Sequence, residues 1–127
     1  MIRVAQDKEL SIQLVQVMMA YTDDVKAGIA AGLKEVGETA MKKVKAGSPS
    51  RTGKYKRGWK LTITEEFGAM RLTIHQSKSG APLTHLLEDG HRTRNKKGWV
   101  KAQPHIRSVE EWAASEAVKA VEKAVKG

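Results

Sequence analysis

Residues 22–47 read "TDDVKAGIAAGLKEVGETAMKKVKAG", and this stretch decides the fold. Its apolar side chains recur every three or four positions, which is the spacing of one face of an α-helix; they are Val25, Ile29, Leu33, Val36, Ala40 and Val44. Thr22 is a suitable N-cap, and Gly47 followed by Pro49 is a strong stop signal. The sequence therefore predicts a helix over 22–47. Three internal glycines weaken it, so it should depend on packing against the rest of the chain.

The residues before this helix also keep a helical spacing. Leu10, Leu14, Val17, Met18 and Tyr21 would share one helix face. We therefore expect a helical extension over 1–21, which either runs into the main helix or kinks near Tyr21.

Two strands are predicted after the main helix. Apolar side chains alternate with polar ones at Trp59, Leu61 and Ile63, and again at Met70, Leu72 and Ile74. Residues 65–68 have a suitable length to join them. The segment 59–76 is therefore expected to form an antiparallel β-hairpin.

The C-terminal half predicts three smaller elements. A short helix over 83–89 should end at Gly90, and residues 91–103 should form a basic loop or a second hairpin. A final helix over 108–126 opens with Ser108 and Glu111 in capping-box spacing and carries a stripe of small residues. The order of elements predicts one α+β domain over 1–127, with the long N-terminal helix and the C-terminal helix packed on a small antiparallel sheet.

The composition limits the function classes. The 127 residues include no cysteine, which excludes disulfides, thiolate catalysis and cysteine zinc sites. The beginning of the chain does not resemble a signal peptide, and no apolar run approaches the ~20 residues that cross a bilayer, so we expect no membrane partner and synthesis in the cytoplasm.

The positive charge is concentrated in two segments. The net charge is +9, and residues 42–60 and 91–107 carry eight and six Lys or Arg with no acid among them. Such segments are typical of contact with nucleic acid or an acidic protein surface, although they also serve as soluble loops. Tyr55 and Trp59 among the cations would suit nucleic-acid binding.

The stretch "THLLEDGH" (84–91) invites a metal hypothesis. His85 and Glu88 would share one helix face, but Gly90 interrupts that helix before His91. A metal-dependent nuclease could use Glu88, Asp89 and His91, yet adjacent acids at one helix end make a poor cluster. We therefore expect no metal and no cofactor, and keep a nucleic-acid-binding protein or metal-dependent nuclease as the alternative function.

Three stretches together resemble a known family. They are "SPSRTGKYKRGW" (48–59), "LTHLLEDGH" (83–91) and "KAQPHI" (101–106), and in this order they are similar to the tail-component family of lambdoid siphophages and prophages, which includes minor tail, tail-completion and head-to-tail joining proteins. The matching residues are Ser48, Pro49, Arg51, Thr52, Gly53, Tyr55, Gly58, Trp59, Leu86, Glu88, Gly90, Pro104, His105 and Ile106.

The resemblance implies a non-catalytic structural protein of the virion neck, assembled in the bacterial host cytoplasm. It implies self-association into a ring, commonly of six copies in the virion and from a monomer in solution, and contact with tail tube and head-closure proteins. Non-specific contact with DNA in the lumen is a further expectation. The candidate interaction surface comprises Arg51, Thr52, Gly53, Lys54, Tyr55, Lys56, Arg57, His85, Glu88, His91, Arg92, Arg94, Lys96 and Lys97. In this loop Gly53 should adopt a positive φ and turn the chain from helix to strand.

Overall fold

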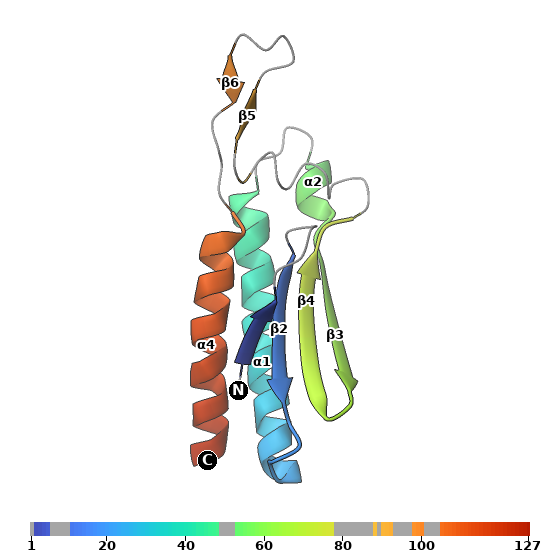
Figure 1. The fold of residues 1–127 in the computed structure, drawn as a ribbon, viewed down its shortest axis with the longest axis vertical. Helices are drawn as coiled ribbons and strands as arrows, with labels where there is room; N and C mark the ends of the chain where they lie inside the picture. The colour runs from blue at the N-terminus through green and yellow to red at the C-terminus, as the bar shows by residue number, and fades with distance from the viewer. Residues whose placement is uncertain are drawn as a thin grey trace.

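The computed structural model describes residues 2–5, 11–48, 53–77, 88, 90–92, 98–100 and 105–127. Its elements are β1 (Ile2–Ala5), β2 (Ile12–Val17), α1 (Asp23–Gly47), α2 (Lys54–Arg57), β3 (Lys60–Glu66), β4 (Ala69–His75), β5 (His91–Arg92), β6 (Trp99–Val100) and α4 (Arg107–Lys126). Two long helices pack on an antiparallel sheet (Figure 1), which confirms the predicted α+β class.

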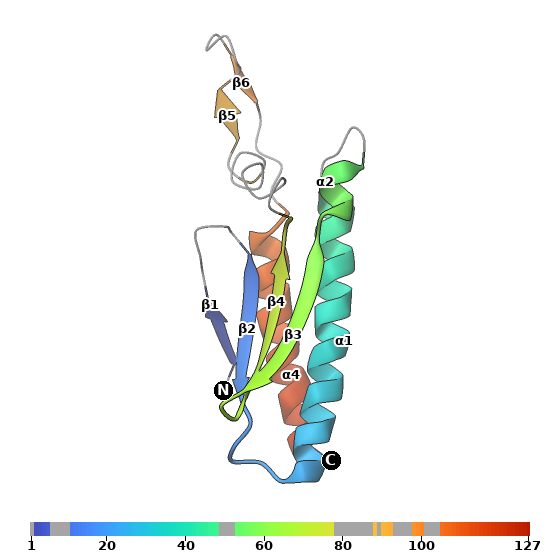
Figure 2. The same ribbon diagram turned by 90° about the vertical axis from the view of Figure 1, so that its right-hand side faces the viewer.

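The main sheet has the strand order β1-β2-β4-β3, and all of its neighbouring strands are antiparallel. Leu14 lies opposite Leu72 and Ile12 opposite Ile74, so that their side chains share one face. These residues and Met70 are buried, and both long helices cover this face (Figure 2). The alternation predicted for 70–74 is thus confirmed, and it places the core between the sheet and the helix pair.

The predicted helical extension over 1–21 is wrong, because β1 and β2 occupy this region. Ile12, Leu14 and Gln16 alternate toward the core, whereas Val17 is exposed. Short apolar segments can fit both periods, and here pairing with β4 satisfies the backbone along the whole strand. The β-branched residues of this segment also favour a strand.

The helix α1 begins and ends close to the predicted positions. The Thr22 hydroxyl accepts a hydrogen bond from the Val25 N–H at 3.4 Å, and Ser48 is the C-cap. The helix α4 runs antiparallel beside α1 (Figure 1). Gly28 and Gly32 face Ala124 and Ala120, where an added Cβ would lie 3.3 and 3.1 Å from the alanine Cβ atoms. The glycines that weaken α1 in isolation therefore allow the two helices to approach closely.

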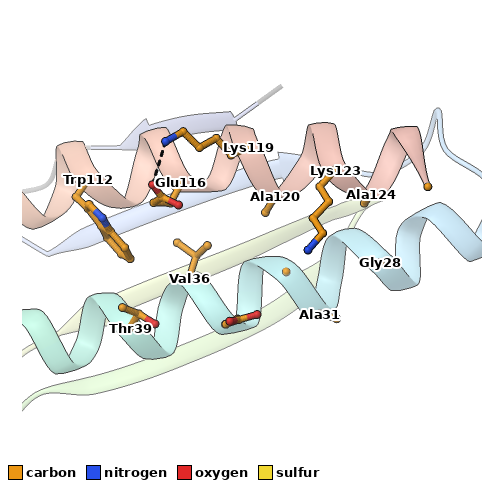
Figure 3. Close-up of a pocket in the computed structure, with 13 residues that line it drawn as sticks. Gly28, Ala31, Val36, Thr39, Trp112, Glu116, Lys119, Ala120, Lys123 and Ala124 are labelled. Carbon is orange, nitrogen blue, oxygen red and sulfur yellow. Dashed lines mark hydrogen bonds and ion pairs between the residues drawn. The ribbon is translucent and has the colours of Figure 1, made fainter.

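A groove follows the outer side of this helix pair (Figure 3). It has a volume of about 660 Å³, and its small residues include Gly28, Gly32, Ala120 and Ala124. Charged side chains of both signs line it as well, and Lys119 donates to Glu116 at 3.3 Å.

The hairpin of β3 and β4 closes more tightly than the predicted 65–68 connection. Glu65 and Glu66 continue β3, and Glu66 pairs with Ala69, so that Phe67 and Gly68 alone form the turn. Both have positive φ, 52° and 73°, as a type I′ turn requires. Trp59 precedes the strand and is buried.

Residues 91–103, expected to form a basic loop or a second hairpin, contain the small hairpin of β5 and β6. His91 pairs with Val100 and Arg92 with Trp99. This hairpin projects from the end of the molecule opposite the β3–β4 turn (Figure 1). The predicted short helix over 83–89 lies outside the described residues except for Glu88, which is helical.

Candidate functional site

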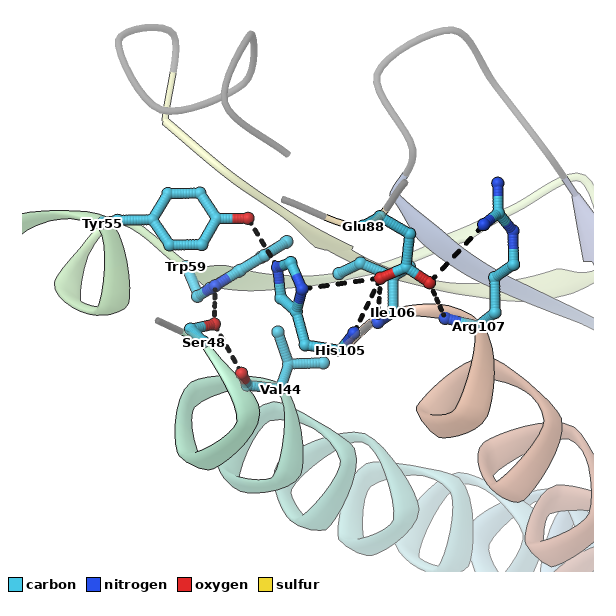
Figure 4. Close-up of polar contacts among 8 residues, drawn as sticks. All are labelled: Val44, Ser48, Tyr55, Trp59, Glu88, His105, Ile106 and Arg107. Atoms are coloured by element: carbon cyan, nitrogen blue, oxygen red, sulfur yellow. Dashed lines mark hydrogen bonds and ion pairs between the residues drawn. The ribbon is translucent and has the colours of Figure 1, made fainter. Parts of the chain in front are cut away.

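The three motifs meet at the end of the helix pair in one cluster of side chains, which are buried except for Arg107 (Figure 4). We call this cluster the motif junction. Its members are Ser48, Tyr55, Trp59, Glu88, His105, Ile106 and Arg107. The end of α1, the helix α2 and the start of α4 supply most of them, and Glu88 comes from the chain between the two sheets. Residues up to 59 positions apart in sequence, Ser48 to Arg107, thereby belong to one set of contacts.

Three rings form the centre of the junction. Tyr55, Trp59 and His105 pack edge to face in pairs, with ring centroids 5.6 to 6.0 Å apart. The Tyr55 hydroxyl and His105 Nε2 share a hydrogen bond of 2.7 Å. The Trp59 indole N–H donates to Ser48 Oγ at 2.9 Å, and the Ser48 hydroxyl donates to the Val44 carbonyl at 2.6 Å. The polar atoms of these rings are therefore satisfied without water.

Glu88 caps the helix α4 from outside it. Its Oε1 accepts the backbone N–H groups of His105 at 2.7 Å and Ile106 at 2.9 Å, and its Oε2 accepts that of Arg107 at 3.2 Å. The N-terminus of a helix leaves such N–H groups without partners and attracts negative charge. The helix has no side-chain cap of its own, so the predicted Ser108–Glu111 capping box is wrong.

The carboxylate of Glu88 also orients His105. Their Oε1 and Nδ1 atoms lie 3.5 Å apart, and both side chains are almost fully buried. The negative charge favours a proton on Nδ1, so that Nε2 accepts the Tyr55 O–H. One buried carboxylate thus links the α4 terminus, the histidine and, through it, α2.

Gln76 and Gly58 support the motif junction from the side of β4 and α2. The buried Gln76 donates its amide to the Tyr55 carbonyl at 2.7 Å and accepts the Ser77 N–H at 2.9 Å. Gly58 leaves no space for a side chain beside it. The alternation of Met70, Leu72 and Ile74 continues to position 76 and places Gln76 on the buried face, but the local sequence does not indicate that its partner is the Tyr55 carbonyl. His105 was signalled by its place in the third motif.

The structure describes eight of the fourteen residues of the candidate interaction surface, whose contacts with partners stay a prediction. Gly53 has a φ of +81°, as predicted, and Lys56 and Arg57 are exposed. Tyr55 and Glu88 are 7% and 2% exposed, so their assignment to a surface is wrong. Lys54 lies in α2, and His91 and Arg92 lie in β5. The remaining residues lie outside the described part of the chain: Arg51, Thr52, His85, Arg94, Lys96 and Lys97.

The geometry around Glu88 and His91 does not suit a metal-binding site. Gly90 has a φ of +81°, and His91 begins a strand instead of continuing the turn of Glu88. The oxygens of Glu88 already accept three backbone N–H groups, which a metal ion would have to displace. Within the described ranges, no three His, Asp or Glu side chains are grouped to hold a metal ion.

The fold and the junction define a small α+β protein whose motif residues hold its shape. The chain belongs to the family described as "Bacteriophage HK97-gp10, putative tail-component", which matches residues 12–90, more than half of its length. It is therefore a phage tail component, a structural protein of the virion that interacts with other virion proteins. No curated protein and no solved structure matches the chain. None of the helices in the described regions is long and apolar enough to cross a membrane.

Proposed function

We propose that this tail component completes the tail or joins it to the head at the virion neck, as a non-catalytic subunit of a ring. The ring has about six copies, the number that the family resemblance implies, and it assembles from monomers made in the host cytoplasm. Its partners are the tail tube on one side and the head-closure proteins on the other. Closed rings of identical subunits need one contact repeated between neighbours.

The motif junction is the observation that carries the proposal. The chemically capable side chains of the three motifs, Tyr55, Glu88 and His105, bond to one another and to the backbone. A general acid or base needs access to a substrate, and these groups are buried. Their contacts instead hold α2 and the start of α4 in one place, from which the β5–β6 hairpin projects. A rigid base with a projecting hairpin suits a subunit that must fit between two larger structures.

The same contacts weaken the nucleic-acid and nuclease alternatives. Tyr55, the proposed stacking residue, is buried, and Glu88 is engaged as a helix cap. Contact of the basic loops with DNA in the lumen needs neither side chain and is compatible with the neck function. Such contact would be weak and would fall steeply with salt.

The test uses a phage or prophage in which this gene is disrupted and the protein is supplied from a plasmid. Replacing Arg51, Lys54 and Arg57 together by Glu should leave the monomer folded, but heads and tails should accumulate unjoined in electron micrographs. The matched control replaces Lys119, Lys123 and Lys126 of α4 by Glu, which makes the same charge change away from the motif loop. Normal yields of infectious particles from the loop variant would contradict the proposal.

Three measurements test the metal-site, nuclease and nucleic-acid-binding alternatives directly. The purified protein should contain no stoichiometric zinc, and it should not cleave DNA with magnesium or manganese. Cleavage that disappears in a Glu88→Gln variant of unchanged fold would favour the nuclease instead. DNA binding that persists at ~0.3 M salt would favour a nucleic-acid-binding function.

A further inference from the structure

Phe67 is the most exposed large apolar residue described, and its backbone is unusual. Its relative exposure is 97%, and its φ is +52°. Bulky side chains rarely adopt this left-handed conformation, and the first position of such a turn is best filled by Asn or Gly. Neither the turn nor the core of the monomer explains a phenylalanine here.

Other exposed apolar side chains lie on the segment beside the Phe67–Gly68 turn. Met19 is 70% exposed and lies against Gly68, while the Met18 N–H donates to the Gly68 carbonyl at 2.7 Å. Val17 is also exposed. We define the tip as Val17, Met19, Glu65, Glu66 and Phe67. Beside it lies a hollow of about 450 Å³, whose apolar lining includes Met18, Ala27 and Ala30.

The surface charges are unevenly distributed along the molecule: the tip carries acids and no cation, although Lys123 and Lys126 in the last turn of α4 lie at the same end (Figure 1). Glu65 and Glu66 of the tip are exposed, and Asp23 and Asp24 begin α1 at the same end of the molecule (Figure 1), where Lys26 lies 4.0 Å from Asp23. We define the basic end as Lys42, Lys43, Lys56, Arg57 and Lys60, which are all exposed. They lie at the end of α1, in α2 and at the start of β3, opposite the β3–β4 turn (Figure 1).

We propose that the tip of one subunit docks on the basic end of a second copy, head to tail. This rests on the self-association in the proposed function and assigns its repeating contact. The acids of the tip then face the cations of the neighbour, and Phe67 leaves water. A contact between two tips would instead bring like charges together. A head-to-tail contact continues from subunit to subunit and closes a ring when its rotation allows.

Crosslinking tests the direction of this contact, because the natural chain has no cysteine. Thr64 and Ala46 are exposed, uncharged neighbours of the tip and of the basic end. A variant with both Thr64→Cys and Ala46→Cys, assembled into particles and treated with a flexible bis-maleimide, should give dimers, trimers and larger multimers on denaturing gels. Thr64→Cys alone should give monomers. Dimers from Thr64→Cys alone, or no multimers from the double variant in assembled particles, would overturn the head-to-tail contact.

Replacing Phe67 separates its role in docking from a role in folding. Phe67→Asn, placed in the double-cysteine variant, should melt at the same or a higher temperature, because Asn suits the turn. Its yield of multimers should fall at least tenfold. The control is Val118→Gln, which removes a side chain that is 45% exposed in the middle of α4, and its yield should be unchanged. Unchanged multimers with Phe67→Asn would refute the docking role of Phe67.

The failure of this inference is distinguishable from that of the proposed function. If the double-cysteine variant restores joined particles but gives no multimers, the neck function stands and the head-to-tail contact is wrong. If particles are joined without the protein, the neck function and the contact that rests on it are both wrong.

Discussion

Glu88 should contribute more to stability than any residue at the surface of α4. Glu88→Ala removes the acceptor of three backbone N–H groups, two of them in buried hydrogen bonds at 2.7 and 2.9 Å. Each buried donor left without a partner costs about 1–3 kcal/mol, and the lost charge at the helix terminus adds roughly 0.5 kcal/mol. Partial entry of water offsets some of this, so that we expect a loss of about 3–5 kcal/mol in the free energy of unfolding.

The isosteric Glu88→Gln variant should have an intermediate effect. The amide oxygen can still accept from His105 and Ile106, but the charge is lost and the amide N–H₂ then faces the N–H of Arg107. Because charge-assisted hydrogen bonds are roughly twice as strong as neutral ones, we expect a loss of about 2 kcal/mol. For a domain whose total stability is about 5–15 kcal/mol, both changes are large.

Urea titrations followed by far-UV circular dichroism measure these differences. Ser108→Ala and Glu111→Gln are the matched controls, because they remove the capping box that the local sequence suggests and the structure does not use. Each should cost less than about 0.5 kcal/mol, whereas loss of a working cap typically costs ~1 kcal/mol. A loss below about 1 kcal/mol for Glu88→Ala together with a larger loss for Ser108→Ala would refute this account of α4.

Three further stability predictions follow from buried contacts, and thermal melts or urea titrations check each. Gln16 is 1% exposed; its Nε2 donates to the Val17 carbonyl at 2.9 Å, but among the described side chains its Oε1 is buried without a hydrogen-bond partner. Gln16→Met removes the unsatisfied oxygen and loses the one hydrogen bond, so it should stabilise the protein by at most about 1 kcal/mol; a loss of stability would show that the hydrogen bond outweighs the unsatisfied oxygen. An added Cβ at Gly37 would lie 2.8 Å from Leu72 Cδ2, so Gly37→Val should lower the free energy of unfolding by about 1–3 kcal/mol. An unchanged free energy of unfolding would mean that the core repacks around the larger side chain at no cost. Tyr55→Phe removes the 2.7 Å contact with His105 and should cost about 1–2 kcal/mol; wild-type stability would show that the hydroxyl is not needed there.

The sequence by itself predicted those elements in which buried apolar side chains recur at one clear spacing. The apolar stripe of 22–47 predicted α1 almost to the residue, because one face of this long helix is buried and its ends carry their own signals. The alternation of Met70, Leu72 and Ile74 predicted β4 for the same reason. The three motifs were also visible in the sequence, and their order led to the family that matches residues 12–90.

Tertiary structure decided what local patterns leave ambiguous. The spacing of the apolar residues in 12–17 fits a helix or a strand. The segment forms a strand because its backbone pairs with the edge of β4. The start of α4 has a suitable capping box in its own sequence, yet it is capped by Glu88, a residue 17 to 19 positions away, which brings a buried negative charge to the N–H groups. Tyr55 and Glu88 suggest a binding surface or a metal site when each is considered alone, yet both are buried beside His105. The sequence shows that these side chains are present. Only the packing of segments far apart in the chain determines whether they face water or one another.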